Sequence, residues 1–130
     1  MRSKQMYKKN LGVLGENIAA TWLLEKNHHI LKRNFRIKFG EADIISVHHS
    51  TLVITEVKTR TSSYFGEPFE AVNRTKINHI SKAGKAFASM HHLQHLPMQI
   101  DIISILLNNF NRVIKFQHFE NITSMSTDTI

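Results

Sequence analysis

GEADIISVHHSTLVITEVK, residues 40–58, carries the strongest structural signal in this sequence. Two runs rich in β-branched residues flank a short polar turn, a pattern typical of a β-hairpin. With the turn centred between His49 and Ser50, the numbers of paired residues sum to 99. That register places Asp43 opposite Glu56.

The charges within this apolar hairpin are unusual. Asp43 and Glu56 would hold their Cβ atoms about 5 Å apart on one face, where two carboxylates repel each other. In the same register Glu41 lies opposite Lys58. A divalent cation would offset the repulsion, since Mg²⁺ is typically held by one or two carboxylates together with substrate phosphates. The sequence therefore predicts a metal site here, and a register shift of one residue would separate the two acids onto opposite faces.

Composition indicates a single domain with a polyanionic partner. The chain has 130 residues, 42% of them hydrophobic, which is enough to bury a core. Its net charge of +7 favours nucleic acid as the partner. No apolar run is long enough to cross a bilayer, so no membrane partner is expected. With no cysteine, neither disulfides nor thiolate metal sites are expected, and the expected location is cytoplasmic. The oligomeric state stays open, a homodimer included.

The apolar spacing predicts the other elements of the fold. From the N-terminus we expect a mobile basic arm (1–10), a helix (12–26), a strand (30–39), the hairpin, a polar loop (59–68), a second helix (from 67 or 68 to about 92), a buried strand (99–107), an edge strand (112–119) and a disordered tail (121–130). This order predicts one α/β domain over residues 1–120, with a central mixed β-sheet of about five strands flanked by two main helices.

The hairpin acids and a lysine suggest phosphodiester hydrolysis. Glu56 and Lys58 are two residues apart on one strand, so their side chains share a face, and Asp43 reaches it from the neighbouring strand. Carboxylates can hold Mg²⁺ or Mn²⁺, which would activate water and polarise a phosphoryl group, while the lysine orients the nucleophile or stabilises charge. Glu16 borders the apolar stripe of the first helix, and its simpler interpretation is a first-turn acid favoured by the helix dipole.

Two further patterns have competing interpretations. Basic side chains recur every three residues along the second helix, at Lys76, His79, Lys82 and Lys85, with Arg74 nearby. They could form a phosphate-binding ridge or a solvated helix face. His91 and His95 have the i, i+4 spacing of zinc ligands, but no acidic general base accompanies them, so a solvated helix end is favoured.

Several motifs together resemble the YraN family of small bacterial proteins. They are Gly15-Glu16-x-x-Ala19, Asn34-x-Arg36, Gly40-Glu41-x-Asp43-x-Ile45, Glu56-Val57-Lys58-Thr59-Arg60 and Gly66-x-Pro68-x-Glu70-Ala71-Val72, followed by Lys76 and a strand centred on Asp101. The likeness runs roughly from Leu11 to Phe119. The family is similar to restriction-endonuclease-like nucleases of the PD-(D/E)xK type and to archaeal Holliday-junction resolvases.

The resemblance implies a nuclease fold and assigns roles within it. Asp43 matches the first motif aspartate, Glu56 and Lys58 match the ExK element, and Glu16 matches the extra acid that junction resolvases place near the metal. The family tends to carry an arginine two residues before the aspartate of the late strand, where this chain has Gln99. We therefore expect Asp101 to be structural rather than catalytic.

The leading hypothesis is a metal-dependent endonuclease-like protein acting on DNA, branched or structured nucleic acid included. Its catalytic residues would be Asp43, Glu56 and Lys58, and Glu16 would join Asp43 and Glu56 around Mg²⁺ or Mn²⁺. The supporting residues would be Glu41, Thr59 and Lys76, and the nucleic-acid-binding residues Arg36, Lys38, Arg60, Arg74, Lys82 and Lys85. One alternative is a catalytically silent nucleic-acid-binding protein that retains the nuclease fold. Another is a structural protein in which Lys58 pairs with Glu41 and Glu56, although surface ion pairs contribute only about 0–1 kcal/mol.

Overall fold

The long hairpin forms the middle of a five-stranded sheet in the computed structural model, which describes residues 4–62 and 66–122. The elements are α1 (Lys4–Glu25), β1 (His29–Ile37), β2 (Gly40–His48), β3 (Thr51–Arg60), the 3₁₀ turn η1 (Pro68–Ala71), α2 (Arg74–Met90), β4 (Met98–Leu107) and β5 (Val113–Phe119). The strand order is β1-β2-β3-β4-β5, with β3 and β4 parallel and the other neighbours antiparallel. This confirms the predicted α/β fold with a mixed sheet and two main helices. No helix within the described ranges is long and apolar enough to cross a membrane.

The predicted hairpin register is confirmed along most of its length. The pairs run from His48–Thr51 to Ile44–Thr55, and each sums to 99. His49 and Ser50 form the turn with φ angles of 49° and 59°, the left-handed conformation that a two-residue hairpin loop requires. The ladder ends at Ile44–Thr55, one pair before the two acids of interest, so backbone pairing does not hold those acids opposite each other.

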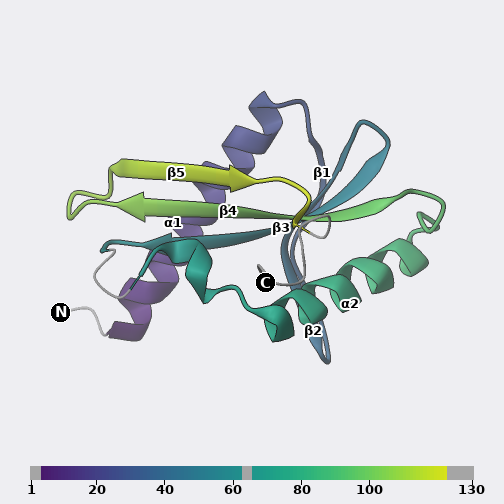
Figure 1. The fold of residues 1–130 in the computed structure, drawn as a ribbon, viewed down its shortest axis with the longest axis horizontal. Coiled ribbons are helices and arrows are strands. Elements are labelled where there is room, and N and C mark those ends of the chain that lie inside the picture. The colour runs from purple at the N-terminus through teal and green to yellow at the C-terminus, as the bar shows by residue number, and fades with distance from the viewer. Residues whose placement is uncertain (1–3, 63–65, 123–130) are drawn as a thin grey trace.

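The two helices cover opposite faces of the sheet (Figure 1). In β4, Ile100 and Ile102 pack in the cluster that contains α2, whereas Ile103 and Ile105 pack in the cluster that contains α1. Side chains alternate between faces along a strand, so an almost continuous apolar run marks a strand buried on both sides. The parallel β3–β4 pair needs a crossover connection, and α2 supplies it.

The predicted bounds of both helices were wrong. The first helix begins at Lys4 rather than Gly12, which puts residues 4–10, expected as a mobile arm, inside α1. Lys, Gln and Met are good helix formers. A helix can therefore include residues without an apolar stripe when its later turns pack in the core, as Ala19, Ala20 and Leu23 do here. The second helix is divided into η1 and α2, because Asn73 caps α2 by accepting a hydrogen bond from the backbone N–H of Lys76.

The expected disordered tail also starts too early. Ile122 is 3% exposed and packs in the core cluster on the α2 face. The backbone N–H of Asn121 donates to Asp101 at 2.9 Å. The rest of the predicted tail, residues 123–130, lies outside the described residues, as do residues 1–3 and 63–65 of the predicted arm and loop.

A chain of hydrogen bonds ties the C-terminal part of α1 to β5 and β4. The indole Nε1 of Trp22 donates to Nδ1 of His118 at 3.0 Å, and Nε2 of His118 lies 2.8 Å from Oδ2 of Asp101. Because an indole N–H can only donate, Nδ1 is the accepting nitrogen and Nε2 carries the proton toward Asp101. Burial would raise the pKa of Asp101, but hydrogen bonds from His118, Asn121 and Gln99 hold it below its usual value. Asp101 is therefore occupied by structural partners.

The helix α1 approaches β3 very closely at Gly15. A Cβ atom added there would lie 1.8 Å from Oγ1 of Thr59 and 2.9 Å from its Cβ. Only glycine allows this approach, which brings the next residue, Glu16, beside the strands. A Cβ added to the exposed Gly12, one turn earlier, would meet nothing within 4 Å.

Substitution of these two glycines should therefore have opposite effects. We expect Gly15→Ala to destabilise the fold by about 1–3 kcal/mol, because Thr59 or the helix must move. Gly12→Ala should stabilise it by about 0.5–1 kcal/mol through helix propensity alone. Urea denaturation followed by circular dichroism measures both. Equal stability of the two variants would contradict the close packing at Gly15.

Candidate functional site

Asp43 lies where β2 and β3 separate. Its Oδ2 accepts a hydrogen bond from the backbone N–H of Val57 at 2.8 Å. In an antiparallel pair a backbone carbonyl of the neighbouring strand would accept such a bond, so the carboxylate takes the place of the ladder at its end. Asp43 also lines a pocket of about 370 Å³ beneath α1, which Glu16 and Arg36 line as well.

Glu56 is the most deeply buried acid of the site. Its side chain is 2% exposed, its Oε1 lies 3.4 Å from Nζ of Lys58 and 3.6 Å from Nζ of Lys76, and its Oε2 is buried with no hydrogen-bond partner. Burial, followed by the charge of Asp43, raises the pKa of Glu56 to about 7. The two acids are therefore close enough to interact, although Glu56 does not line the pocket that contains Asp43.

Burial also governs the ionisation of Asp43. It raises the pKa of this carboxyl, the hydrogen bond from Val57 opposes the shift, and the charge of Glu16 adds to it. Asp43 lines the pocket beneath α1, whereas Glu56 lies two residues after Ile54, which packs in the cluster on the α2 face. A shared face for the two carboxylates stays a prediction.

Lys76 is part of the site rather than of a solvated ridge. Its Nζ pairs with Oε1 of Glu41 and lies near Glu56. Burial would lower its pKa, but the hydrogen bond to Glu41 and the charge of Glu56 raise it, so Lys76 stays charged. A Cβ added to Gly40 would lie 2.6 Å from the backbone oxygen of His79, so this glycine lets α2 pack against the start of β2. Glu41 thus pairs with Lys76, and not with Lys58 as the register had suggested.

Glu16 lies in the middle of α1, so its interpretation as a first-turn acid was wrong. Its Oε1 accepts hydrogen bonds from Nε of Arg33 and Nδ2 of Asn34, both at 3.0 Å. These two partners were not predicted, because regular strand periodicity over residues 30–39 does not bring Arg33 and Asn34 together at one acid of the first helix. Asn34 has a φ of 54°, which breaks the alternation of the strand, and asparagine tolerates that conformation better than most residues. The motif Asn34-x-Arg36 was the sequence signal that could have pointed to Asn34 as a residue of the site.

Asp43 and Glu56 have the donor chemistry that a hard divalent cation requires. Among residues 4–62 and 66–122, no three His, Asp or Glu side chains gather closely enough to hold an ion by themselves. Mg²⁺ needs fewer protein ligands, because it keeps waters and binds substrate phosphates. A cation beside the two acids would offset their repulsion and give Oε2 of Glu56 a partner. Glu16 lines the pocket with Asp43, but its Oε1 is already engaged.

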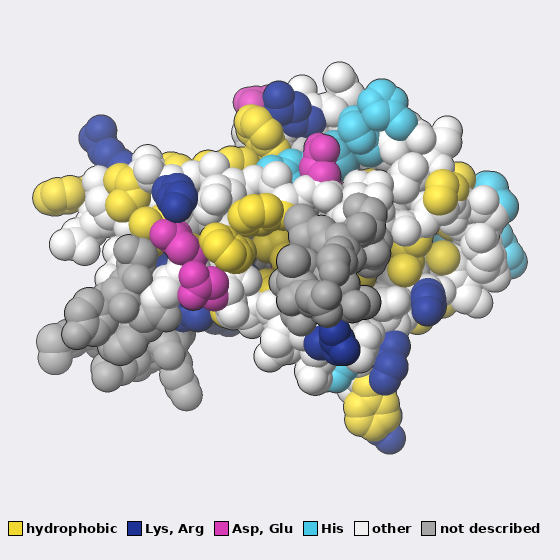
Figure 2. Space-filling model, viewed as in Figure 1, with side chains coloured by type: hydrophobic (Ala, Val, Ile, Leu, Met, Phe, Trp, Pro, Cys, Tyr) yellow, Lys and Arg dark blue, Asp and Glu magenta, His cyan; other side chains and the backbone are white. Residues whose placement is uncertain are grey.

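The basic residues predicted to bind nucleic acid are spread over several surfaces. Arg36 is exposed and lines the pocket that contains Asp43, and the Nζ of Lys38 lies 5.4 Å from the ring centre of Phe39. The other residues predicted to bind nucleic acid are exposed as well: Arg60, Arg74, Lys82 and Lys85. On the face drawn in Figure 2, Lys and Arg side chains stand in separate places and do not merge into one patch. Of the six residues predicted to bind nucleic acid, Arg36 is therefore the one that shares a pocket with the acids Asp43 and Glu16. Thr59 packs against Gly15.

Comparison with known sequences relates this chain to one family. Residues 15–105 match the family model described as uncharacterised protein family UPF0102. A UPF0102 protein of Clostridium novyi (strain NT) is 37% identical over 115 residues, which cover 88% of this chain and 96% of the relative. A UPF0102 protein of Caldanaerobacter subterraneus subsp. tengcongensis is 40% identical over 105 residues, 81% of this chain and 86% of the relative. One from Caldicellulosiruptor saccharolyticus is 36% identical over 116 residues, 89% and 98% of the two chains.

The matched region contains all the acids of the candidate site, from Glu16 to Glu56. The YraN family, which the motifs resembled, corresponds to UPF0102. The chain therefore belongs to the UPF0102 family.

Proposed function

We propose that this protein is a divalent-metal-dependent nuclease that hydrolyses phosphodiester bonds in nucleic acid, with DNA as the first substrate to test. The observation that supports this best is the pair formed by the half-buried Asp43 and the buried Glu56, in which each pKa is raised and two lysines lie beside Glu56. The net charge of +7 suits a polyanionic substrate.

Each residue of the site has a distinct role in this proposal. Asp43 and Glu56 hold Mg²⁺ or Mn²⁺, which supplies Lewis acidity toward the phosphoryl group and a more acidic water. The ammonium of Lys58 stabilises negative charge on the phosphate oxygens. Lys76, fixed by Glu41, keeps a positive charge beside Glu56. Arg36 holds the phosphate backbone at the pocket. Hydrolysis adds water across one P–O bond and leaves a phosphate monoester and a hydroxyl.

A nucleic-acid-binding protein that keeps the fold and cuts nothing is the alternative. The observation in its favour is that Glu56 is 2% exposed and does not line the pocket that contains Asp43. The first two experiments below distinguish these functions.

Metal binding should depend on Asp43. We expect Mn²⁺ to bind the wild type at one site and at least tenfold more weakly to Asp43→Asn, because the ion loses a charged ligand. Asparagine keeps an oxygen that can accept from Val57, so the strands stay in place. Isothermal titration calorimetry measures the affinity, and Glu25→Gln, an exposed acid on α1, is the matched control. Failure of the wild type to bind Mn²⁺, or equal binding by Asp43→Asn, would remove the metal site.

Cleavage should depend on Lys58, whereas metal binding should not. We expect Lys58→Met to retain Mn²⁺ and to cut about 10²–10³-fold more slowly, because the phosphate oxygens lose a charge partner. The assay is a screen of branched, single-stranded and duplex DNA with Mn²⁺ or Mg²⁺, with Lys26→Met as an exposed lysine control outside the site. If the wild type binds metal and nucleic acid but cuts none of these substrates, the silent alternative is correct.

The contribution of Glu56 to the stability of the metal-free protein should fall as the pH rises. The folded-state pKa of Glu56, about 7, exceeds the ordinary glutamate value of 4.5, so the folded state binds this proton more tightly than the unfolded state does. The contribution of Glu56 to stability therefore falls between about pH 4.5 and 7. Glu56→Gln removes this pH-dependent loss of stability, because glutamine does not ionise. We expect it to stabilise the fold, relative to wild type, by on the order of 2–3 kcal/mol more at pH 8 than at pH 4.5.

Urea denaturation in EDTA at the two pH values measures this difference, with Glu25→Gln as the control. A stability change on Glu56→Gln that is the same at both pH values would show that folding does not raise the pKa of Glu56.

A further inference from the structure

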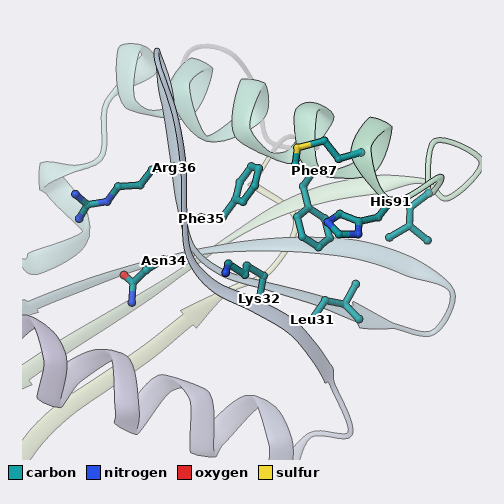
Figure 3. Close-up of a pocket in the computed structure, with 9 residues that line it drawn as sticks. Leu31, Lys32, Asn34, Phe35, Arg36, Phe87 and His91 are labelled. Atoms are coloured by element: carbon teal, nitrogen blue, oxygen red, sulfur yellow. The ribbon is translucent and has the colours of Figure 1, made fainter.

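A second pocket, of about 640 Å³, lies between β1 and the C-terminal end of α2 (Figure 3). Its lining is mixed: apolar and aromatic side chains such as Phe35, Phe87 and Leu31 are joined by Lys32 and Arg36. In Figure 3 the rings of Phe87 and His91 lie beside each other on the α2 side, with Lys32 and Leu31 extending from β1. Neither the acids nor the lysines of the candidate site take part in it.

Three aromatic rings lead from the buried core to solvent. Phe35 and Phe87 pack edge to face, with ring centres 5.3 Å apart, and both are buried. The ring of His91 lies over Phe87 at 4.3 Å with a tilt of 33°, and His91 itself is exposed. Met90, 62% exposed, stands at the same opening. A planar, partly apolar ligand can stack on the exposed ring of His91, which the buried ring of Phe87 supports.

The second pocket and the candidate site share two lining residues on β1. Asn34 and Arg36 line both this pocket and the pocket that contains Glu16 and Asp43. Arg36 also lines a third cavity, of about 320 Å³, with Glu41 and His79. A single ligand chain that crosses β1 at Arg36 would therefore contact the aromatic pocket on one side and Asp43 on the other.

We propose that this pocket receives one unpaired nucleobase of the nucleic acid, while the adjoining phosphates pass over Arg36 toward Asp43. This inference rests on the proposed function and narrows its substrate to nucleic acid with single-stranded segments. Aromatic side chains bind bases by stacking only when the base faces are free, and a base paired within a duplex cannot enter a pocket. Lys32 and Arg36 complement the phosphates on either side of the base.

The test measures binding without cleavage. Fluorescence anisotropy in EDTA compares a labelled 12-nucleotide single strand with the same strand carrying one abasic residue at each position in turn, and with its duplex. We expect the wild type to bind the duplex more weakly, and to lose on the order of tenfold affinity at one abasic position. Equal binding of duplex and single strand, or no effect of any abasic position, would overturn the proposal.

Variants link the effect to the pocket. His91→Ala should abolish the abasic effect, whereas His95→Ala, which removes an exposed ring just outside the pocket lining, should preserve it. Met90→Glu, a second exposed position, should weaken single-strand binding by placing a negative charge at the opening. An abasic effect that persists in both His91→Ala and Met90→Glu would place base recognition elsewhere.

The outcome is independent of hydrolysis. An abasic effect in a protein that cuts nothing supports base recognition and rejects the nuclease. Cleavage that is indifferent to abasic positions supports the nuclease and rejects base recognition.

Discussion

The burial of Glu56 beside Asp43 is the electrostatic constraint on which the centre of this fold depends. Burying a carboxylate costs free energy unless a positive charge or hydrogen-bond donors compensate. Here the ammonium groups of Lys58 and Lys76 lie 3.4 Å and 3.6 Å from Oε1 of Glu56, and Oε2 has no hydrogen-bond partner. Lys76 is held in turn by Glu41, at a place where Gly40 lets α2 approach β2. The position of α2 and the ionisation of the acids are thus coupled.

The α/β fold could be predicted because its signals are local and redundant. The alternating pattern of the hairpin determines the register of β2 against β3. The apolar run of β4 indicates a strand that is buried on both faces. The end of the ladder could not be predicted, because a side-chain carboxylate there accepts the backbone hydrogen bond of Val57. The start of α1 was missed because residues 4–10 carry helix propensity but no apolar stripe.

The acids of the candidate site could be named from sequence, but most of their partners could not. Asp43, Glu56 and Lys58 occur in a short hairpin whose geometry follows from strand periodicity. Lys76 was expected as a supporting residue, yet its pairing with Glu41 depends on how closely α2 packs. Arg33 and Asn34 reach Glu16 through an irregular strand with a left-handed residue, which a period of two does not describe.

The hydrogen bond between Trp22 and His118 has a spectroscopic consequence. Trp22 is the single tryptophan of the chain, and its ring also packs against Phe116 with centres 5.0 Å apart. Its fluorescence therefore reports specifically on the docking of α1 against β5. The intrinsic emission of this protein thus provides an optical signal for one helix–strand contact, without any added label.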